Sequence, residues 1–152
     1  MITKKAEYAI KILAELAGRN KERFYASREI AAVHDIPLNL VSQLVSHLQK
    51  SGLIQSIRGS SGGIRLIADP AEISLRQVIE LFDGPVGLTH CLKQPDYCQK
   101  SDSCPIHQIL ERTQEKIIAD LEQATIKDLA EAYQRLEGEK VDRKPGEKLP
   151  LR

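Results

Sequence analysis

The feature that most constrains the fold is a glycine-rich turn between two short alternating segments. Apolar and polar residues alternate from Leu53 to Ile57 and again from Ile64 to Ile67, and the residues RGSSGG at positions 58–63 connect the two segments. An alternation with a period of two places successive side chains on opposite faces of a strand. The sequence therefore predicts a two-stranded hairpin whose turn contains three glycines.

Three helices are predicted before this hairpin, because apolar residues recur there at three- and four-residue steps. The first covers Thr3 to Gly18, and the second begins at Ser27, a suitable N-cap, and ends near His34. The third begins with Asn39 as its candidate cap and ends at Ser51. Three helices followed by a hairpin are the order of a winged helix-turn-helix domain.

The polar face of the third helix is predicted to contact DNA. Short polar and basic side chains without acidic neighbours can donate hydrogen bonds to base edges and phosphates in a major groove. A solvated face would explain a lone helix better, but the hairpin that follows favours DNA binding, and its turn lacks the lysine and helix of a nucleotide-binding P-loop. The predicted DNA-binding residues are Ser27, Arg28, Asn39, Leu40, Ser42, Gln43, His47, Arg58, Gly59, Ser60, Ser61 and Arg65.

The second half of the chain is predicted to contain three more helices. Ser74 and Gln77 fit a capping box at the start of one, and Pro105 lies in the first turn of a long helix that begins near Cys104. A further helix covers Thr125 to about Leu136, with Thr125 as its cap and Asp128 three positions on. The apolar stripe of the long helix is hard to bury in so small a domain, so we expect a homodimer that presents two recognition helices to a palindromic DNA operator.

Charge and composition agree with a two-part organisation. Residues 1–70 contain ten Lys and Arg against six Asp and Glu, whereas residues 71–152 contain twelve against fifteen. We expect a DNA-binding part at 1–70, a cofactor-binding and dimerisation part at 71–137 and a flexible tail at 138–152. No apolar run approaches twenty residues and no signal peptide is recognisable, so we expect a cytoplasmic protein without a membrane partner.

A loop between the predicted helices contains every cysteine of the chain. Cys91, Cys98 and Cys104 are separated by six and five residues, and His107 follows Cys104 after two more. An odd number of cysteines does not suit a disulfide framework, and thiolates bind zinc, copper(I) or iron–sulfur clusters. Structural zinc usually takes cysteines two to four residues apart, so the longer spacing favours an iron–sulfur cluster, with zinc or no metal as alternatives.

Other functional classes fit less well. A cysteine enzyme would need a thiolate paired with a general base and a substrate pocket; Cys104 and His107 can pair, but no other catalytic constellation is visible. We therefore expect neither an enzyme nor a small-molecule substrate. An iron–sulfur carrier protein is a further alternative, and it would lack salt-dependent DNA binding.

From Met1 to about Leu136 the chain resembles the IscR and NsrR type of winged-helix transcription regulators, the Rrf-two family. The matching stretches are ITKKAEYAI, SQLVSHLQKSGLIQSIRGSSGGIRL, ISLRQVIELFDGP and the three cysteines before the long helix. The resemblance implies a homodimeric regulator that senses iron–sulfur supply, redox state or nitric oxide through a cluster bound by these cysteines. Members without the cysteines sense differently, so a zinc- or thiol-based regulator of the same fold is the alternative.

The resemblance leaves several ligands for the cluster open. His107 matches the Cys-x-x-His of the IscR type and favours a 2Fe-2S over a 4Fe-4S cluster. Glu7 lies where NsrR-like members supply an aspartate from the partner subunit, and RsrR-like members use a glutamate there together with a histidine that matches His34. Leu40 and Ser42 depart from the aromatic residue and the glutamate that are frequent at these positions, which leaves the operator sequence unassigned.

Overall fold

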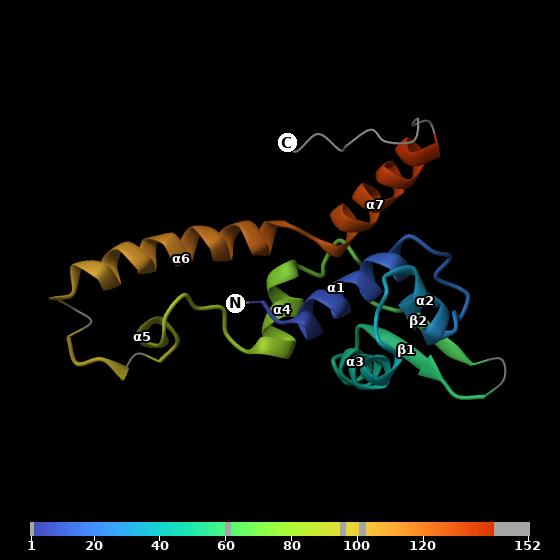
Figure 1. Cartoon of the computed structure of the whole chain (residues 1–152), viewed down its shortest axis with the longest axis horizontal. Helices are drawn as coiled ribbons and strands as arrows, with labels where there is room; N and C mark the ends of the chain where they lie inside the picture. Colours follow the sequence, from blue (N-terminus) through green and yellow to red (C-terminus); the bar gives the residue numbers. More distant parts are fainter. Residues whose placement is uncertain (1, 60–61, 95–96, 101–102, 142–152) are drawn as a thin grey trace.

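The computed structural model describes residues 2–59, 62–94, 97–100 and 103–141 (Figure 1). Its elements are α1 (Lys4–Ala17), α2 (Ser27–Val33), α3 (Leu38–Lys50), β1 (Ile54–Ile57), β2 (Gly63–Leu66), α4 (Leu75–Asp83), α5 (His90–Lys93), α6 (Pro105–Gln123) and α7 (Ile126–Val141). The predicted mainly α fold with a small β-hairpin is confirmed. No helix in these ranges is long and apolar enough to cross a lipid bilayer.

The hairpin forms a wing that is attached to the helices by one extra backbone bridge. Strands β1 and β2 pair antiparallel, with Ile54 opposite Leu66 and Ile57 opposite Gly63. The backbone N–H of Ile64 donates to the carbonyl of Tyr25 at 2.8 Å, and the N–H of Tyr25 donates back at 3.0 Å. A β-carbon at position 63 would collide with the Tyr25 backbone, so this close approach requires Gly63.

One hydrophobic core joins the first three helices and the hairpin to the second half of the chain. Leu13, Leu44 and Leu48 are buried in it together with Val78 and Ile126. Burying side chains of this size stabilises the fold by roughly 1.5–3 kcal/mol each. Because Val78 and Ile126 pack with the first three helices, the core crosses the boundary expected at residue 70. The division into parts 1–70 and 71–137 stays a prediction about organisation.

The long helix α6 lies mostly outside this core. Figure 1 shows it as an arm that extends from the body of the protein. None of its residues is buried, and the side chains of Ile106 and Ile109 are 67% and 57% exposed. The predicted long helix that begins after Cys104, with Pro105 in its first turn, is confirmed.

The predicted caps of the second and third helices are wrong, whereas two later caps are confirmed. Ser27 is the first residue of α2, because the carbonyl of Ala26 already accepts a hydrogen bond from the N–H of Glu29 at 2.9 Å. Asn39 is the second residue of α3, because the carbonyl of Pro37 accepts one from the N–H of Leu40 at 2.9 Å. The hydroxyl of Ser74 accepts a hydrogen bond from the N–H of Gln77 at 3.1 Å, and that of Thr125 accepts one from Asp128 at 3.2 Å.

Two segments contain more helix than the sequence predicts. The cysteine loop includes α5, a single turn closed by hydrogen bonds from Lys93 to Thr89 and from Gln94 to His90. Helix α7 continues to Val141 instead of ending near Leu136, since the residues between them are mostly good helix formers. The remainder of the predicted tail, residues 142–152, lies outside the described residues.

Candidate nucleic-acid interface and cysteine loop

A groove of about 690 Å³ separates α3 from the wing. Ser27 and Arg28 line it from the start of α2, Ser42 from α3, and Arg58 and Gly59 from the wing. No acidic residue is among its lining residues. The structure thus brings five of the predicted DNA-binding residues to one groove with two arginines, a surface suited to a phosphate backbone.

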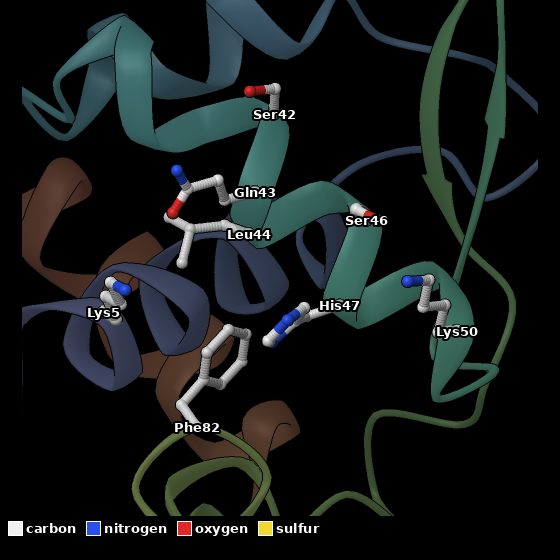
Figure 2. Close-up of a pocket in the computed structure, with 8 residues that line it drawn as sticks. All are labelled: Lys5, Ser42, Gln43, Leu44, Ser46, His47, Lys50 and Phe82. Atoms are coloured by element: carbon white, nitrogen blue, oxygen red, sulfur yellow. The ribbon is translucent and has the colours of Figure 1, made fainter.

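A second pocket, of about 410 Å³, also borders α3 and shares Ser42 and Ser46 with the groove (Figure 2). Gln43 and His47 line it from α3, and Phe82 lines it from the end of α4. The imidazole of His47 stacks on the Phe82 ring, with the ring centres 5.4 Å apart. Gln43 and His47 are both exposed, and His47 is in addition held by its contact with Phe82.

Some predicted DNA-binding residues lie apart from both pockets. Arg65 donates from Nε to Gln55 at 3.0 Å, and its guanidinium lies 4.7 Å from the centre of the Phe24 ring. Leu40 packs against the core, while Asn39 is exposed at the start of α3. Ser60 and Ser61 at the tip of the wing lie outside the described residues.

Several lining residues are absent from the predicted DNA-binding set, among them Ser46 and Lys50 of α3. Gln49 and Ser56 line the groove beside the wing, and Lys5 lines the pocket beside Phe82. Gln49 lies seven residues after Ser42, a spacing that keeps both on one helix face and that would have identified it. No local pattern marks Lys5, because α1 reaches α3 only through the tertiary fold.

The two alternative cluster ligands from the first half of the chain are already engaged. Lys4 and Lys11 contact the Glu7 carboxylate at 2.6 and 2.8 Å. The hydrogen bonds from Lys11 and from Lys4 lower the pKa of Glu7 to about 2. Glu7 is therefore a carboxylate at neutral pH, and it would have to leave both lysines to bind a metal.

His34 lies at the junction of α1 and α7. Its Nε2 lies 3.3 Å from a carboxylate oxygen of Glu15, but the two groups are not aligned as a hydrogen bond. The centre of its ring lies 5.4 Å from the centre of the Tyr133 ring. Only 10% of the side chain is exposed. As with Glu7, metal binding by His34 would require these contacts to break.

The cysteine loop presents its donors around the start of α6. Cys91 lies in α5, with its sulfur 3.1 Å from the Thr89 hydroxyl oxygen, and Cys104 is the N-cap of α6. His107 follows in the first turn, and its Nδ1 is buried without a hydrogen-bond partner among the described residues. Within the same residues no three His, Cys, Asp or Glu side chains converge on a shared metal position. The donor types suit a cluster, but the loop must close to hold one.

A short segment links this loop to α1 and α4. Residues 84–88 line an apolar pocket of about 450 Å³ together with residues of α4 and α6. The N–H of Leu88 donates to Oε1 of Gln114 at 3.0 Å, which ties the segment to α6. At its other end, Asp83 accepts hydrogen bonds from the N–H and hydroxyl of Thr3 at 2.8 and 2.5 Å. The cysteine loop is therefore connected to α1 and α4 through hydrogen-bonded residues.

Comparison with known protein families identifies the family of this chain. The model of the Rrf2 family, described as an iron-dependent transcriptional regulator, matches residues 2–132. The chain belongs to the Rrf2 family. As a member of the Rrf2 family, this protein is a DNA-binding transcription regulator and not an enzyme.

Individual relatives span most of this Rrf2 chain. The chain is 29% identical to the HTH-type transcriptional regulator NsrR of Shouchella clausii over 129 residues, which cover 84% of this chain and 87% of that protein. It is 32% identical to IscR of Serratia proteamaculans, over 84% of this chain and 77% of IscR. Among solved structures it resembles CymR, the global cysteine regulator of B. subtilis, with a TM-score of 0.72, 27% identity, and 87% and 97% coverage of the two chains.

Proposed function

We propose that this Rrf2 protein is a homodimer whose cysteine loop binds an iron–sulfur cluster, and that the state of the cluster controls DNA binding. The observation that carries the proposal is the buried, unpartnered Nδ1 of His107, three residues after Cys104. A buried polar atom without a partner is costly, and coordination to a metal would satisfy it. The family description as iron-dependent also supports this assignment.

The proposed ligands are Cys91, Cys98, Cys104 and His107, a set that favours a 2Fe-2S over a 4Fe-4S cluster. Cys104 and His107 lie at the N-terminal end of α6, where unpaired N–H groups stabilise the negative charge of a thiolate-bound cluster. Glu7 of the partner subunit, with or without His34, is the alternative fourth ligand, and its ion pairs with Lys4 and Lys11 oppose that role.

The dimer is proposed to form along α6. Ile106 and Ile109 expose most of their side chains there, and no residue of α6 is buried by its own chain. A two-fold axis beside α6 would cover this surface and present two copies of α3 to the half-sites of a palindromic operator. We place the protein in the cytoplasm, whose reducing conditions keep thiols available to a cluster.

Residues between the loop and α3 would relay the state of the loop. A bound cluster supplies a centre that responds to oxidation, iron loss or nitric oxide. Closure of the loop would pull on residues 84–88 and thus on the end of α4, where Phe82 stacks on His47 of α3. Because a ligand shifts such an equilibrium only by its differential affinity, the two loop states must differ in DNA affinity.

A thiol-based regulator is the second candidate function. Cys91 and Cys104 are free, partly exposed thiols, and no three metal-binding side chains converge within the described ranges. The likeness to CymR, a cysteine regulator, also favours it. An iron–sulfur carrier protein would not need a groove lined by two arginines and no acidic residue, as lies between α3 and the wing.

An anaerobic absorbance spectrum with iron and sulfide analysis tests the proposal. Protein that is reconstituted with iron and sulfide should be coloured and contain both elements in stoichiometric amounts. Colourless protein without iron, whose DNA binding nevertheless responds to thiol oxidants, would establish the thiol-based function. Bound zinc without sulfide would identify the zinc-based alternative.

A further inference from the structure

We infer that the pocket between α3 and Phe82 is a second binding site for the DNA backbone, in which Lys5 of α1 and Lys50 of α3 contact phosphates. The inference rests on DNA binding by the winged helix and is independent of the cluster. It adds a helix outside the helix-turn-helix to the DNA-binding surface. The groove beside the wing, with Arg28 and Arg58, would then serve the other strand.

The lining of the pocket is cationic and contains no carboxylate. Figure 2 shows Lys5 and Lys50 on opposite sides of the pocket, with His47 and Phe82 between them. Both lysines are exposed, and neither forms an ion pair within the described part of the chain. Lys4 and Lys11 on the same α1 helix both contact Glu7, so Lys5 is the lysine of α1 that remains available for an external anion.

Helix stability does not explain Lys5. The N-terminal turn of a helix carries partial positive charge, so a cation there is unfavourable unless an acidic group compensates it. Glu7 compensates Lys4 at 2.6 Å, whereas Lys5 has no such partner among the described residues. By contrast, Lys50 lies in the last turn of α3, where a cation is favourable. An external phosphate would supply the negative charge that Lys5 lacks.

A recognition helix in a major groove lies between two phosphate backbones, so contacts on both of its sides are possible. The groove is about 12 Å wide and is bordered by one phosphate backbone on each side, so an inserted helix lies between the two strands. The wing flanks α3 on one side and α1 with the end of α4 flanks it on the other. The stack of His47 on Phe82 holds the imidazole as the floor of this second site.

The salt dependence of DNA binding by Lys5→Ala tests the inference. The probe is a duplex selected from random DNA by the wild-type protein. The plot of log affinity against log salt has a negative slope. Each lost phosphate contact should reduce the magnitude of this slope by about 0.9 for each protomer bound to the DNA. The loss of affinity should be similar on unrelated sequences, because phosphate contacts carry no sequence information. The thermal midpoint should not fall.

Lys4→Ala is the matched control, since it removes the same charge from the neighbouring position while Lys11 still contacts Glu7. It should retain the wild-type slope. An unchanged slope in Lys5→Ala, or an equal decrease in Lys4→Ala, would overturn the inference. Single phosphates on the strand away from the wing can be replaced by neutral methylphosphonates. One such replacement should weaken binding of the wild-type protein. The same replacement should not weaken binding of Lys5→Ala. If Arg58→Ala weakens binding while Lys5→Ala does not, the inference alone fails and DNA binding through the wing stands.

Discussion

The imidazole of His47 lies against the phenyl ring of Phe82, with ring centres 5.4 Å apart and planes inclined by 29°. This contact joins α3, the predicted recognition helix, to the last turn of α4, the helix that leads into the cysteine loop. A stacked aromatic pair contributes about 0.5–1.5 kcal/mol beyond the area it buries. A contact of this size can shift the position of α3 reversibly, as the proposed relay needs.

Phe82→Leu should uncouple the loop from DNA. The substitution keeps an apolar side chain but removes the ring, so we expect a loss of about 1 kcal/mol in the free energy of unfolding. The ratio of DNA affinities between cluster-containing and cluster-free protein should fall toward one, as measured by gel shift. Leu81→Ala on the exposed side of α4 is the control and should retain the wild-type ratio. A wild-type ratio in Phe82→Leu would exclude this contact from the relay.

Cys104→Ala should abolish the visible chromophore while leaving a folded dimer. The loss of one thiolate removes a ligand at the start of α6, but Cys104 is only partly buried and outside the hydrophobic core. Absorbance and iron content after anaerobic reconstitution, with circular dichroism and sedimentation on the same sample, measure both effects. Ser103→Ala, at the preceding exposed position, should retain the chromophore.

Arg58→Ala should weaken DNA binding on all sequences. Arg58 is exposed in the wing and lines the groove, where it can contact a phosphate. The slope of log affinity against log salt should decrease in magnitude by about 0.9 for each protomer bound. An unchanged affinity in Arg58→Ala would show that the wing does not contact DNA.

Gln43→Ala should instead change base preference at a single position, by about 1–3 kcal/mol, because an amide can pair with a base edge.

Ile109→Glu should separate the dimer into monomers. Its side chain is 57% exposed on α6, and a carboxylate buried at a helix interface without a partner is strongly unfavourable. Sedimentation velocity should show a smaller species, with weaker binding to a two-half-site operator. Gln108→Glu adds the same charge at an exposed position about 100° round the helix and should remain dimeric. If both Ile109→Glu and Gln108→Glu remained dimeric, the dimer interface would not include Ile109.

Acid should remove the contribution of Glu7 to stability. Its pKa is lowered from 4.5 to about 2 in the folded protein, so the unfolded chain binds the proton more readily. The stabilisation is therefore present above pH 4.5 and is lost as the pH falls toward 2. In cluster-free protein, the difference in thermal midpoint between wild type and Glu7→Gln should shrink over this range. The effect should be small and sensitive to salt, because the groups are exposed to solvent.

A control for this pH dependence is Glu22→Gln. Glu22 is exposed and forms no ion pair within the described residues. Its substitution should leave the pH dependence of the thermal midpoint unchanged. If Glu7→Gln and wild type lost stability in parallel from pH 4.5 to 2, the contacts with Lys4 and Lys11 would not stabilise the folded state.

Much of the secondary structure follows from local patterns. The alternation around the RGSSGG turn predicted the hairpin, and Pro105 after Cys104 predicted the start of the long helix. The starts of α2 and α3 were missed by one or two residues, because the carbonyls of Ala26 and Pro37 begin the helices without a side-chain cap. A cap assigned from residue type alone cannot anticipate this.

The sequence by itself determined the winged helix, the long helix and a loop with three cysteines, since periodicity, turns and ligand spacing depend on neighbouring residues. Only the tertiary structure decided that Arg65 stacks on Phe24, that His34 lies beside Glu15, and that Lys5 borders the recognition helix. These contacts join residues that are far apart in the chain or on different elements. They arise when helices pack to bury their apolar faces, and a pattern read along the chain does not contain that arrangement.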